Sequence, residues 1–337
     1  MTTIKVKFNP TSKGNQEEST NHKITRNGKI RQSTKKSKSF ENDCSLRNFM
    51  GNVIQQLKDT GKERTSETYT AALNSFMSFR GERDVPLDGL DSNLLISYEA
   101  WLKARGVTKN TISFYMRILR AVYNRAVEKG LTEQHHPFRH VYTGVDKTAK
   151  RAVSIDIIKK LKSIDLSDKP AKCFARDMFL FSFYTRGMSF VDMAFLKKND
   201  LKNGILTYRR RKTGQKLTIK WEKCMEEIVK NHPSDDASPY LLPIIKKKGN
   251  ERKQHKNSLH LMNYHLKNIS QSIGLQQPVT MYVARHSWAS AAQANNIPIS
   301  IISEGMGHNS EATTRIYLAS IETSLVDNAN KMLLDLL

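Results

Sequence analysis

Apolar residues recur at helical spacing between residues 41 and 142. A period of 3.6 residues places such positions on one face of a helix, where they pack into a core. Four helices are predicted, through Leu46–Leu57, Tyr69–Met77, Leu94–Leu102 and Ile112–Val127. Hydroxyl or carboxylate side chains stand where three of them begin, at Ser45, Asp91 or Ser92, and Thr108. The pattern therefore predicts a helical domain over residues 41–142.

Residues 154–337 combine helical and strand-like patterns. Residues 172–184 are so apolar that we expect a central, buried helix. Alternation over Ile205–Arg211 and Gln215–Lys220 predicts a β-hairpin with Lys212 at its tip. Ser258 is the predicted N-cap of a later helix, after a basic loop over residues 246–256. The fold class is therefore mainly α with a small β component: a helical domain followed by a mixed α/β domain.

Three segments lie outside these two patterns. Residues 1–40 hold ten Lys or Arg and two Asp or Glu, a net charge of +8. They are either a disordered basic tail or a small arm that contacts DNA. Residues 143–153 are polar and basic, so we predict that they form the linker between the two domains. Lys147, Lys150 and Arg151 would let this linker lie along the charged backbone of a polyanionic partner. Residues 321–337 predict a short amphipathic helix.

The formal net charge of +23 indicates a polyanionic partner, and nucleic acid is the first candidate. On the polar face of the helix over residues 109–127, Arg117 and Arg120 are candidates for phosphate contacts. The alternative is that these arginines only form the solvent-exposed face of the helix. No apolar run approaches the ~18 residues needed to span a bilayer. Three widely separated cysteines and no apolar N-terminal signal favour a cytoplasmic protein with reduced thiols.

Candidate chemistry gathers between Thr280 and Tyr317, where Arg285, His308 and Tyr317 stand among apolar residues. A tyrosine can attack phosphorus and form a covalent phosphotyrosine. Arginine and histidine donors suit the charge that builds on the phosphate oxygens. Scattered carboxylates and histidines without paired ligand spacing indicate no metal site.

An ordered set of motifs extends this cluster through the chain. The motifs are Tyr184-Thr185-Arg186-Gly187, Lys212-Thr213-Gly214, Ala284-Arg285-His286-Ser287-Trp288-Ala289, Met306-Gly307-His308 and Thr313-Thr314-Arg315-Ile316-Tyr317. With them the chain, over about residues 41–337, resembles the tyrosine recombinases of the phage-integrase family. The resemblance implies a helical, SAM-like core-binding domain over residues 41–142 and a catalytic domain over residues 154–337. It also implies that residues 1–40 are a short arm-binding segment.

Carried over position by position, the resemblance implies Tyr317 as nucleophile and Arg186 and Arg285 as phosphate-binding arginines. Lys212 resembles the general acid of the hairpin, and His308 matches the histidine of the Gly-His turn. Two positions depart from the family pattern. Tyr282 stands where a histidine is usual, three residues before Arg285; a phenol donates a hydrogen bond but does not shuttle protons near neutral pH. Ser189 stands where an acidic residue is common, and Asp192 is the expected support for Arg186 instead.

The implied function is site-specific recombination through a 3′-phosphotyrosine intermediate and a Holliday junction, in the integration, excision or inversion of a mobile element. The implied partners are double-stranded DNA with a specific core site, three further copies of the chain in a tetramer, and an accessory DNA-bending protein. No cofactor is expected, and the place of action is the cytoplasm, with the nucleoid. By this interpretation Arg211, beside the hairpin tip, is one of the residues that face DNA. A type IB topoisomerase and a catalytically impaired DNA-binding protein are the alternatives.

Overall fold

The computed structural model describes residues 44–146, 152–318, 331 and 334, without the side chains of Ile316 and Tyr317. The N-terminal arm and the linker residues Lys147, Lys150 and Arg151 of the sequence prediction lie outside the described residues. So does the predicted C-terminal helix, apart from residues 331 and 334. The chain divides into two compact units, Met1–Lys147 and Thr148–Leu337. Within the described residues, no helix has the length and apolar character to cross a bilayer.

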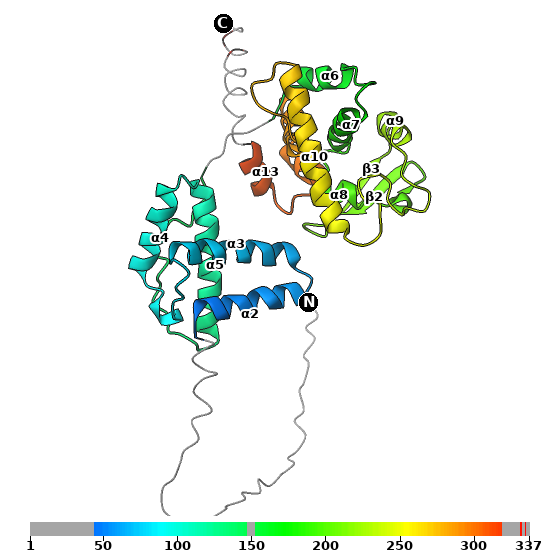
Figure 1. The fold of residues 1–337 in the computed structure, drawn as a ribbon. Helices are drawn as coiled ribbons and strands as arrows, with labels where there is room; N and C mark the ends of the chain where they lie inside the picture. Colours follow the sequence, from blue (N-terminus) through cyan, green and yellow to red (C-terminus); the bar gives the residue numbers. More distant parts are fainter. Residues whose placement is uncertain (1–43, 147–151, 319–330, 332–333, 335–337) are drawn as a thin grey trace, which may run out of the picture. The chain divides into compact units, whose positions relative to one another are not determined.

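The first unit is helical, as the apolar pattern predicted (Figure 1). Its helices are α2 (Leu46–Asp59), α3 (Glu63–Phe79), α4 (Ser92–Ala104) and α5 (Lys109–Glu128), with a 3₁₀ turn over Leu87–Gly89. Ser45 caps α2 by accepting from the Asn48 amide, and Asp91 caps α4 by accepting from the Leu94 amide. The helix α3 packs against the other three, and α2 and α4 also pack against α5. Fully buried side chains of Phe76, Tyr98 and Tyr123 lie in the core.

The segment that leaves α5 is bound back onto the helices of this unit. The Ser113 hydroxyl donates to the Gly144 carbonyl over 2.5 Å. The Asn110 side chain pairs in both directions with the backbone of Asp146, over 2.9 and 2.8 Å. The Glu99 carboxylate accepts from the Tyr142 amide over 3.0 Å. The chain is therefore held against α4 and α5 as far as residue 146.

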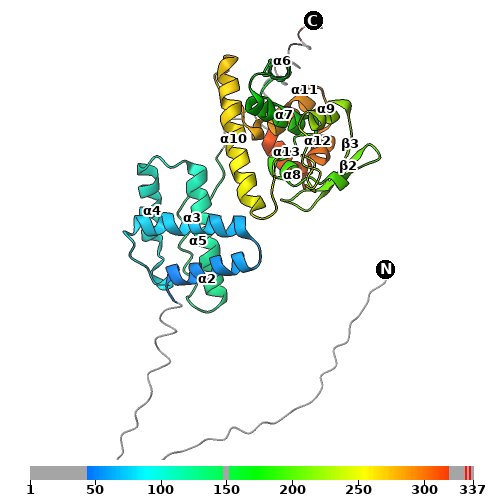
Figure 2. The same ribbon diagram turned by 45° about the vertical axis from the view of Figure 1, so that its right-hand side comes forward.

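The second unit is built around one central helix (Figures 1 and 2). Its helices are α6 (Ile155–Ser163), α7 (Pro170–Tyr184), α8 (Phe190–Ala194), α9 (Lys223–Asn231), α10 (Glu251–Ser272), α11 (Met281–Ala294), α12 (Ile299–Met306) and α13 (Glu311–Leu318), with a 3₁₀ turn over Lys198–Asp200. The helix α7 packs against α6, α9, α10 and α11. Met178, Phe179 and Phe181 of α7 are buried, so the apolar run identified in the sequence is the core of this unit.

A small antiparallel sheet flanks the helices, in the order β1–β2–β3. Its strands are β1 (Leu201–Lys202), β2 (Ile205–Arg209) and β3 (Lys216–Lys220). Leu206 pairs with Ile219 and Tyr208 with Leu217, and all four side chains are buried. The alternation in the sequence predicted β2 and β3. It did not indicate β1, because two residues are too few to show a period.

The start of α10 corrects one expectation. The helix begins at Glu251, seven residues before the predicted cap Ser258, so much of the expected basic loop is helical. Asn250 takes up the left-handed conformation just before it, with φ of 56°, and the Glu251 carboxylate accepts from the Gly249 amide over 3.0 Å. Ser258 instead donates to the Ile244 carbonyl over 3.2 Å. A Gly-Asn turn therefore starts the helix where a hydroxyl cap was expected.

Candidate active site

Arg285 lies at the centre of the site, in the interior of α11, with 6% of its surface exposed. Its Nη1 donates to the Gly187 carbonyl over 2.8 Å, and its Nη2 donates to the Met306 carbonyl over 2.6 Å. The same Nη2 lies 3.0 Å from Nε2 of His308. One guanidinium therefore joins the turn after α7 to the end of α12. This is the neighbourhood that the separate sequence motifs implied.

The turn after α7 brings the backbone close to Arg285. Arg186 and Gly187 both adopt the left-handed conformation, with φ of 62° and 72°. A Cβ at Gly187 would lie 2.7 Å from the Arg285 Cα, so only glycine fits this approach. The left-handed conformation costs Arg186 about 1 kcal/mol or more, which points to a constrained functional position. Its half-buried side chain reaches toward β3, where Nη1 lies 3.5 Å from the Thr218 carbonyl oxygen.

His308 follows Gly307, which ends α12 in the left-handed conformation. Burial lowers the pKa of His308 to about 4, helped by the positive charges of Arg285, Arg210 and Lys212. The ring is therefore neutral near pH 7 and accepts at Nε2 from Arg285. Its proton then sits on Nδ1, which lies 2.7 Å from the Thr314 hydroxyl.

Thr314 links the histidine to the helix that carries Tyr317. Thr314 is buried in α13, and Tyr317 lies three residues later in the same helix. Residues three apart lie on neighbouring positions of one helical face. The His308–Thr314 hydrogen bond therefore ties the face of α13 that bears position 317 to the Arg285 centre.

The β2–β3 hairpin supplies the remaining motif. Lys212 is exposed at the hairpin tip, and its positive charge contributes to the lowered pKa of His308. The Asp192 carboxylate accepts from the Arg211 amide over 2.8 Å and from the Ser189 hydroxyl over 2.6 Å. The Arg211 guanidinium lies 3.9 Å from the centre of the Phe195 ring. Asp192 thus supports the base of the hairpin, and the expectation that it supports Arg186 is wrong.

The structure also brings in Arg210, which the motif comparison missed. Its side chain is 7% exposed, and its Nη1 donates to the Gly307 carbonyl. A signal was present in the sequence: alternation puts Leu206, Tyr208 and position 210 on the inner side of the hairpin. Arg209 and Arg211, by the same alternation, are exposed.

Two further sets of sequence-predicted residues lie at the surface. Tyr282 is 61% exposed in the first turn of α11, and its ring meets the His286 ring edge-on at 4.6 Å between centroids. Arg117 and Arg120 are exposed on α5. Arg120 borders a hollow of about 530 Å³ together with Tyr123, His136 and Arg139.

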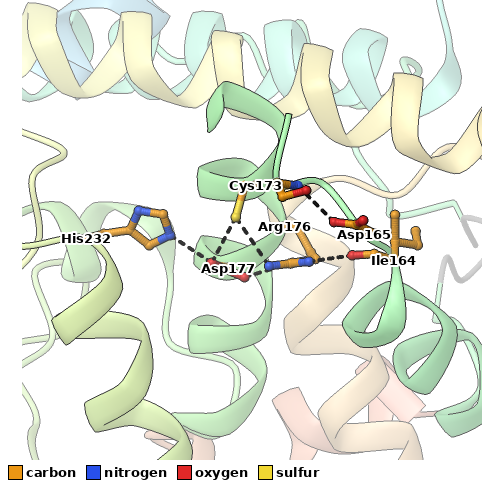
Figure 3. A network of polar contacts seen from close by, with 7 residues as sticks. Ile164, Asp165, Cys173, Arg176, Asp177 and His232 are labelled. Atoms are coloured by element: carbon orange, nitrogen blue, oxygen red, sulfur yellow. Dashed lines mark hydrogen bonds and ion pairs between the residues drawn. The ribbon is translucent and has the colours of Figure 1, made fainter. Parts of the chain in front are cut away.

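A second polar cluster joins α7 to the end of α9 (Figure 3). The buried Asp177 carboxylate accepts from Arg176 Nε over 2.8 Å and lies 2.7 Å from Nε2 of His232. Arg176 also donates to the Ile164 carbonyl over 2.7 Å and to Sγ of Cys173 over 3.3 Å. Burial favours a raised pKa for Asp177, but the hydrogen bonds from His232 and Arg176 outweigh it and hold the pKa below its usual value.

Donor atoms of Cys173, Asp177 and His232 all lie within 4.8 Å of one another, which is close enough to hold a metal ion. Sequence spacing did not indicate this cluster, because His232 lies 55 residues after Asp177, at the C-cap of α9. Here the three side chains are bonded to one another and to Arg176, whose positive charge disfavours a cation. We interpret the cluster as a structural tie between α7 and α9.

Comparisons with known proteins agree with this arrangement. The sequence model described as "Phage integrase SAM-like domain" matches residues 45–141, and the model described as "Phage integrase family" matches residues 152–323. The tyrosine recombinase XerA of Pyrococcus furiosus is 28% identical over 263 residues, which cover 76% of this chain and 84% of the relative.

Two solved structures share the fold. A lambda integrase dimer bound to a COC′ core site has a TM-score of 0.63 at 16% identity, covering 81% of this chain and 95% of that chain. A lambda integrase tetramer bound to a Holliday junction has a TM-score of 0.62 at 15% identity, covering 81% and 77%. Given the two matched family models and the tyrosine recombinase relative, the chain belongs to the phage integrase family, as a tyrosine recombinase.

Proposed function

We propose that this protein is a site-specific DNA recombinase that uses Tyr317 as its nucleophile. The observation that carries the proposal is the chain of contacts from Gly187 through Arg285 and His308 to Thr314. These contacts bring the turn after Arg186 and the helix of Tyr317 to one centre. Such a centre offers positive charge to a phosphate and a phenol on an adjoining helix.

In the proposed reaction, the Tyr317 oxygen forms a bond to phosphorus while the bond from phosphorus to the 5′ oxygen breaks. Arg186 and Arg285 stabilise the negative charge on the non-bridging oxygens. Lys212 donates a proton to the departing 5′ oxygen, and the phenol gives up its own proton to solvent water. The 3′-phosphotyrosine retains the energy of the broken bond, so rejoining needs no cofactor.

The roles of His308 and Tyr282 follow from their surroundings. Neutral His308 fixes the Arg285 guanidinium, and the anionic phosphate would raise the pKa of the ring once DNA binds. Tyr282, at the exposed end of α11, is a candidate phenol donor to the DNA backbone at the site that the family fills with histidine. Neither role requires a metal ion.

DNA is held, in this proposal, by the core-binding domain over residues 41–142 and the catalytic domain over residues 154–337. Exposed Arg117 and Arg120 on α5, and Arg211 at the hairpin, supply phosphate contacts. The linker over residues 143–153 adds Lys147, Lys150 and Arg151, and the basic segment 1–40 acts as an arm at a second DNA position.

The assembly that we propose is a homotetramer on two duplexes that exchanges strands through a Holliday junction. The lambda integrase tetramer on a Holliday junction supports this, because the fold is shared. The C-terminal segment would dock on a neighbouring subunit. The biological role would be movement of a mobile genetic element in the cytoplasm, on nucleoid DNA, at a specific core site with an accessory DNA-bending protein.

A nicked suicide substrate tests the proposal. Cleavage of such a duplex loses a short fragment and traps the covalent adduct. The wild-type chain is expected to form an adduct that a denaturing gel resolves, and Tyr317→Phe is expected to form none. An adduct in Tyr317→Phe, or no adduct in the wild type on DNA carrying its core site, would refute the assignment. Relaxation of any supercoiled plasmid would instead favour a topoisomerase.

A further inference from the structure

Arg210 stands between two parts of the site that separate segments of the chain supply. Its backbone amide donates to the Gln215 carbonyl over 2.8 Å, and its carbonyl accepts from the Gly214 amide over 2.8 Å. These two bonds close the hairpin loop whose tip is Lys212. Its side chain points inward and donates through Nη1 to the Gly307 carbonyl, next to His308. One residue therefore contacts both the hairpin and the histidine turn.

The contact with Gly307 leaves no room for a Cβ at that position unless the Arg210 side chain moves. A Cβ at Gly307 would lie 2.7 Å from Cδ of Arg210 and 3.0 Å from Cδ1 of Leu217. Gly307 is also left-handed, with φ of 65°. The turn of His308 is consequently held from two sides: Arg285 binds the Met306 carbonyl and the ring, and Arg210 binds the next carbonyl.

Stability alone gives little reason for a charged side chain here. Burying a guanidinium costs several kcal/mol of hydration unless a carboxylate compensates. Among the described residues, the ion pairs of this unit do not include Arg210, and its buried Nε has no hydrogen-bond partner. The nearby carboxylate of Asp192 is engaged by the Arg211 amide and Ser189. An apolar residue would fill the same place at lower cost.

We propose that Arg210 is a positioning residue that ties the Gly307 turn to the β2–β3 hairpin, so that His308 and Lys212 are placed as one unit. The inference rests on the proposed function, because it assigns Lys212 the role of general acid. Without the tie, the hairpin tip loses its fixed register against the phosphate site. Proton delivery to the 5′ oxygen then suffers more than phosphate binding does.

The experiment compares Arg210→Met with Arg209→Met in the full chain. Both variants remove one arginine from the same strand end. Arg209 is exposed on the outer side and donates to the Gly214 carbonyl of the hairpin loop over 3.1 Å, whereas Arg210 donates to the Gly307 turn. Single-turnover adduct formation is measured on two suicide duplexes, one with the normal 5′ oxygen and one with sulfur at that bridging position. A thiolate leaves without prior protonation, since thiols have a pKa near ~8.5, so the sulfur duplex does not need Lys212.

Arg210→Met is expected to cleave the oxygen duplex about 10²-fold more slowly, the scale of a misplaced catalytic group. On the sulfur duplex, the cleavage rate of Arg210→Met should rise at least about tenfold toward the wild-type rate. The rate of Lys212→Ala should rise in the same way. DNA binding should change less than about threefold, and Arg209→Met should cleave both duplexes nearly as the wild type does. An equal defect on both duplexes, or an equal loss in Arg209→Met, would overturn the inference.

Gly307→Ala provides an independent variant, because it disrupts the same contact from the other side. It should show the same recovery on the sulfur duplex, and Arg210→Met combined with Gly307→Ala should be no slower than the slower single variant. Fully additive losses would overturn the proposal. Circular dichroism checks that each variant is folded. Absence of a Tyr317 adduct in the wild type would refute the proposed function itself, whereas failure at Arg210 alone leaves that function standing.

Discussion

Gly187→Ala tests whether the close approach of the α7 turn to α11 supports the site. The new Cβ would lie 2.7 Å from Cα of Arg285, 2.8 Å from its Cγ and 3.0 Å from its Cβ. The first of these is a backbone atom, so rotation of a side chain cannot relieve the contact. Either the turn or α11 must shift, and both carry an arginine of the site.

The expected loss has two parts. A residue with a Cβ costs about 1–2 kcal/mol in the left-handed conformation. Overpacking a tight contact adds about 1–3 kcal/mol. Gly204→Ala isolates the first part, because Gly204 has φ of 71° and a Cβ added there would have no atom within 4 Å. We therefore expect Gly187→Ala to lose about 1–3 kcal/mol more free energy of unfolding than Gly204→Ala.

Urea unfolding of the full chain, followed by tryptophan fluorescence, measures this difference, since Trp221 and Trp288 both lie in the second unit. With a slope near ~2 kcal/mol per molar, a difference of about 2 kcal/mol separates the midpoints by about 1 M. Gly187→Ala should also lose adduct formation under conditions in which it stays folded. Equal midpoints for the two alanine variants would show that the close approach does not matter for stability.

Three further predictions concern the site and the α7–α9 tie. Arg285→Ala should abolish adduct formation while DNA affinity falls less than about tenfold, ~1.4 kcal/mol; a larger loss in a filter-binding assay would make Arg285 a docking residue. His308 is neutral in the fold with a pKa of about 4, whereas the unfolded chain protonates near ~6.5. The free energy of unfolding should therefore fall as pH drops from about 6.5 toward 4, and less so in His308→Gln; parallel pH profiles would contradict this. Asp177→Asn should cost about 3 kcal/mol, because it removes the buried carboxylate that pairs with the half-buried Arg176. Asp156→Asn, in an exposed pair, should cost under about 1 kcal/mol. Equal thermal shifts in these two variants would argue against the tie.

Local patterns in the sequence anticipated much of the fold. Ser45 and Asp91 cap helices because a short oxygen-bearing side chain satisfies the first free amides, and that chemistry is visible in sequence. The alternation of Leu206 and Tyr208 marked the inner face of the hairpin. Arg285 and His308 stand 23 residues apart, yet their motif order indicated one centre, and the structure places them in contact.

Features that depend on distant partners were not predictable in the same way. Asp192 binds the Arg211 amide, 19 residues later, where the family pattern suggested an arginine side chain. His232 meets Asp177 only because α7 and α9 pack side by side. Asn250 adopts a left-handed turn, and α10 begins directly after it at Glu251. Ser258, whose hydroxyl suggested an N-cap, therefore lies inside the helix. In each case tertiary packing selected one of several partners that local chemistry allowed.

The acceptors around Arg285 have a consequence for mutational tolerance. Two of them are main-chain carbonyls, of Gly187 and Met306. Every amino acid supplies the same carbonyl, so exchanges at the acceptor positions leave the hydrogen-bonding atom in place. Selection at these positions acts on backbone shape and side-chain volume, not on polarity. In a saturation library, position 306 should accept other apolar residues of similar size, whereas position 187 should tolerate almost none.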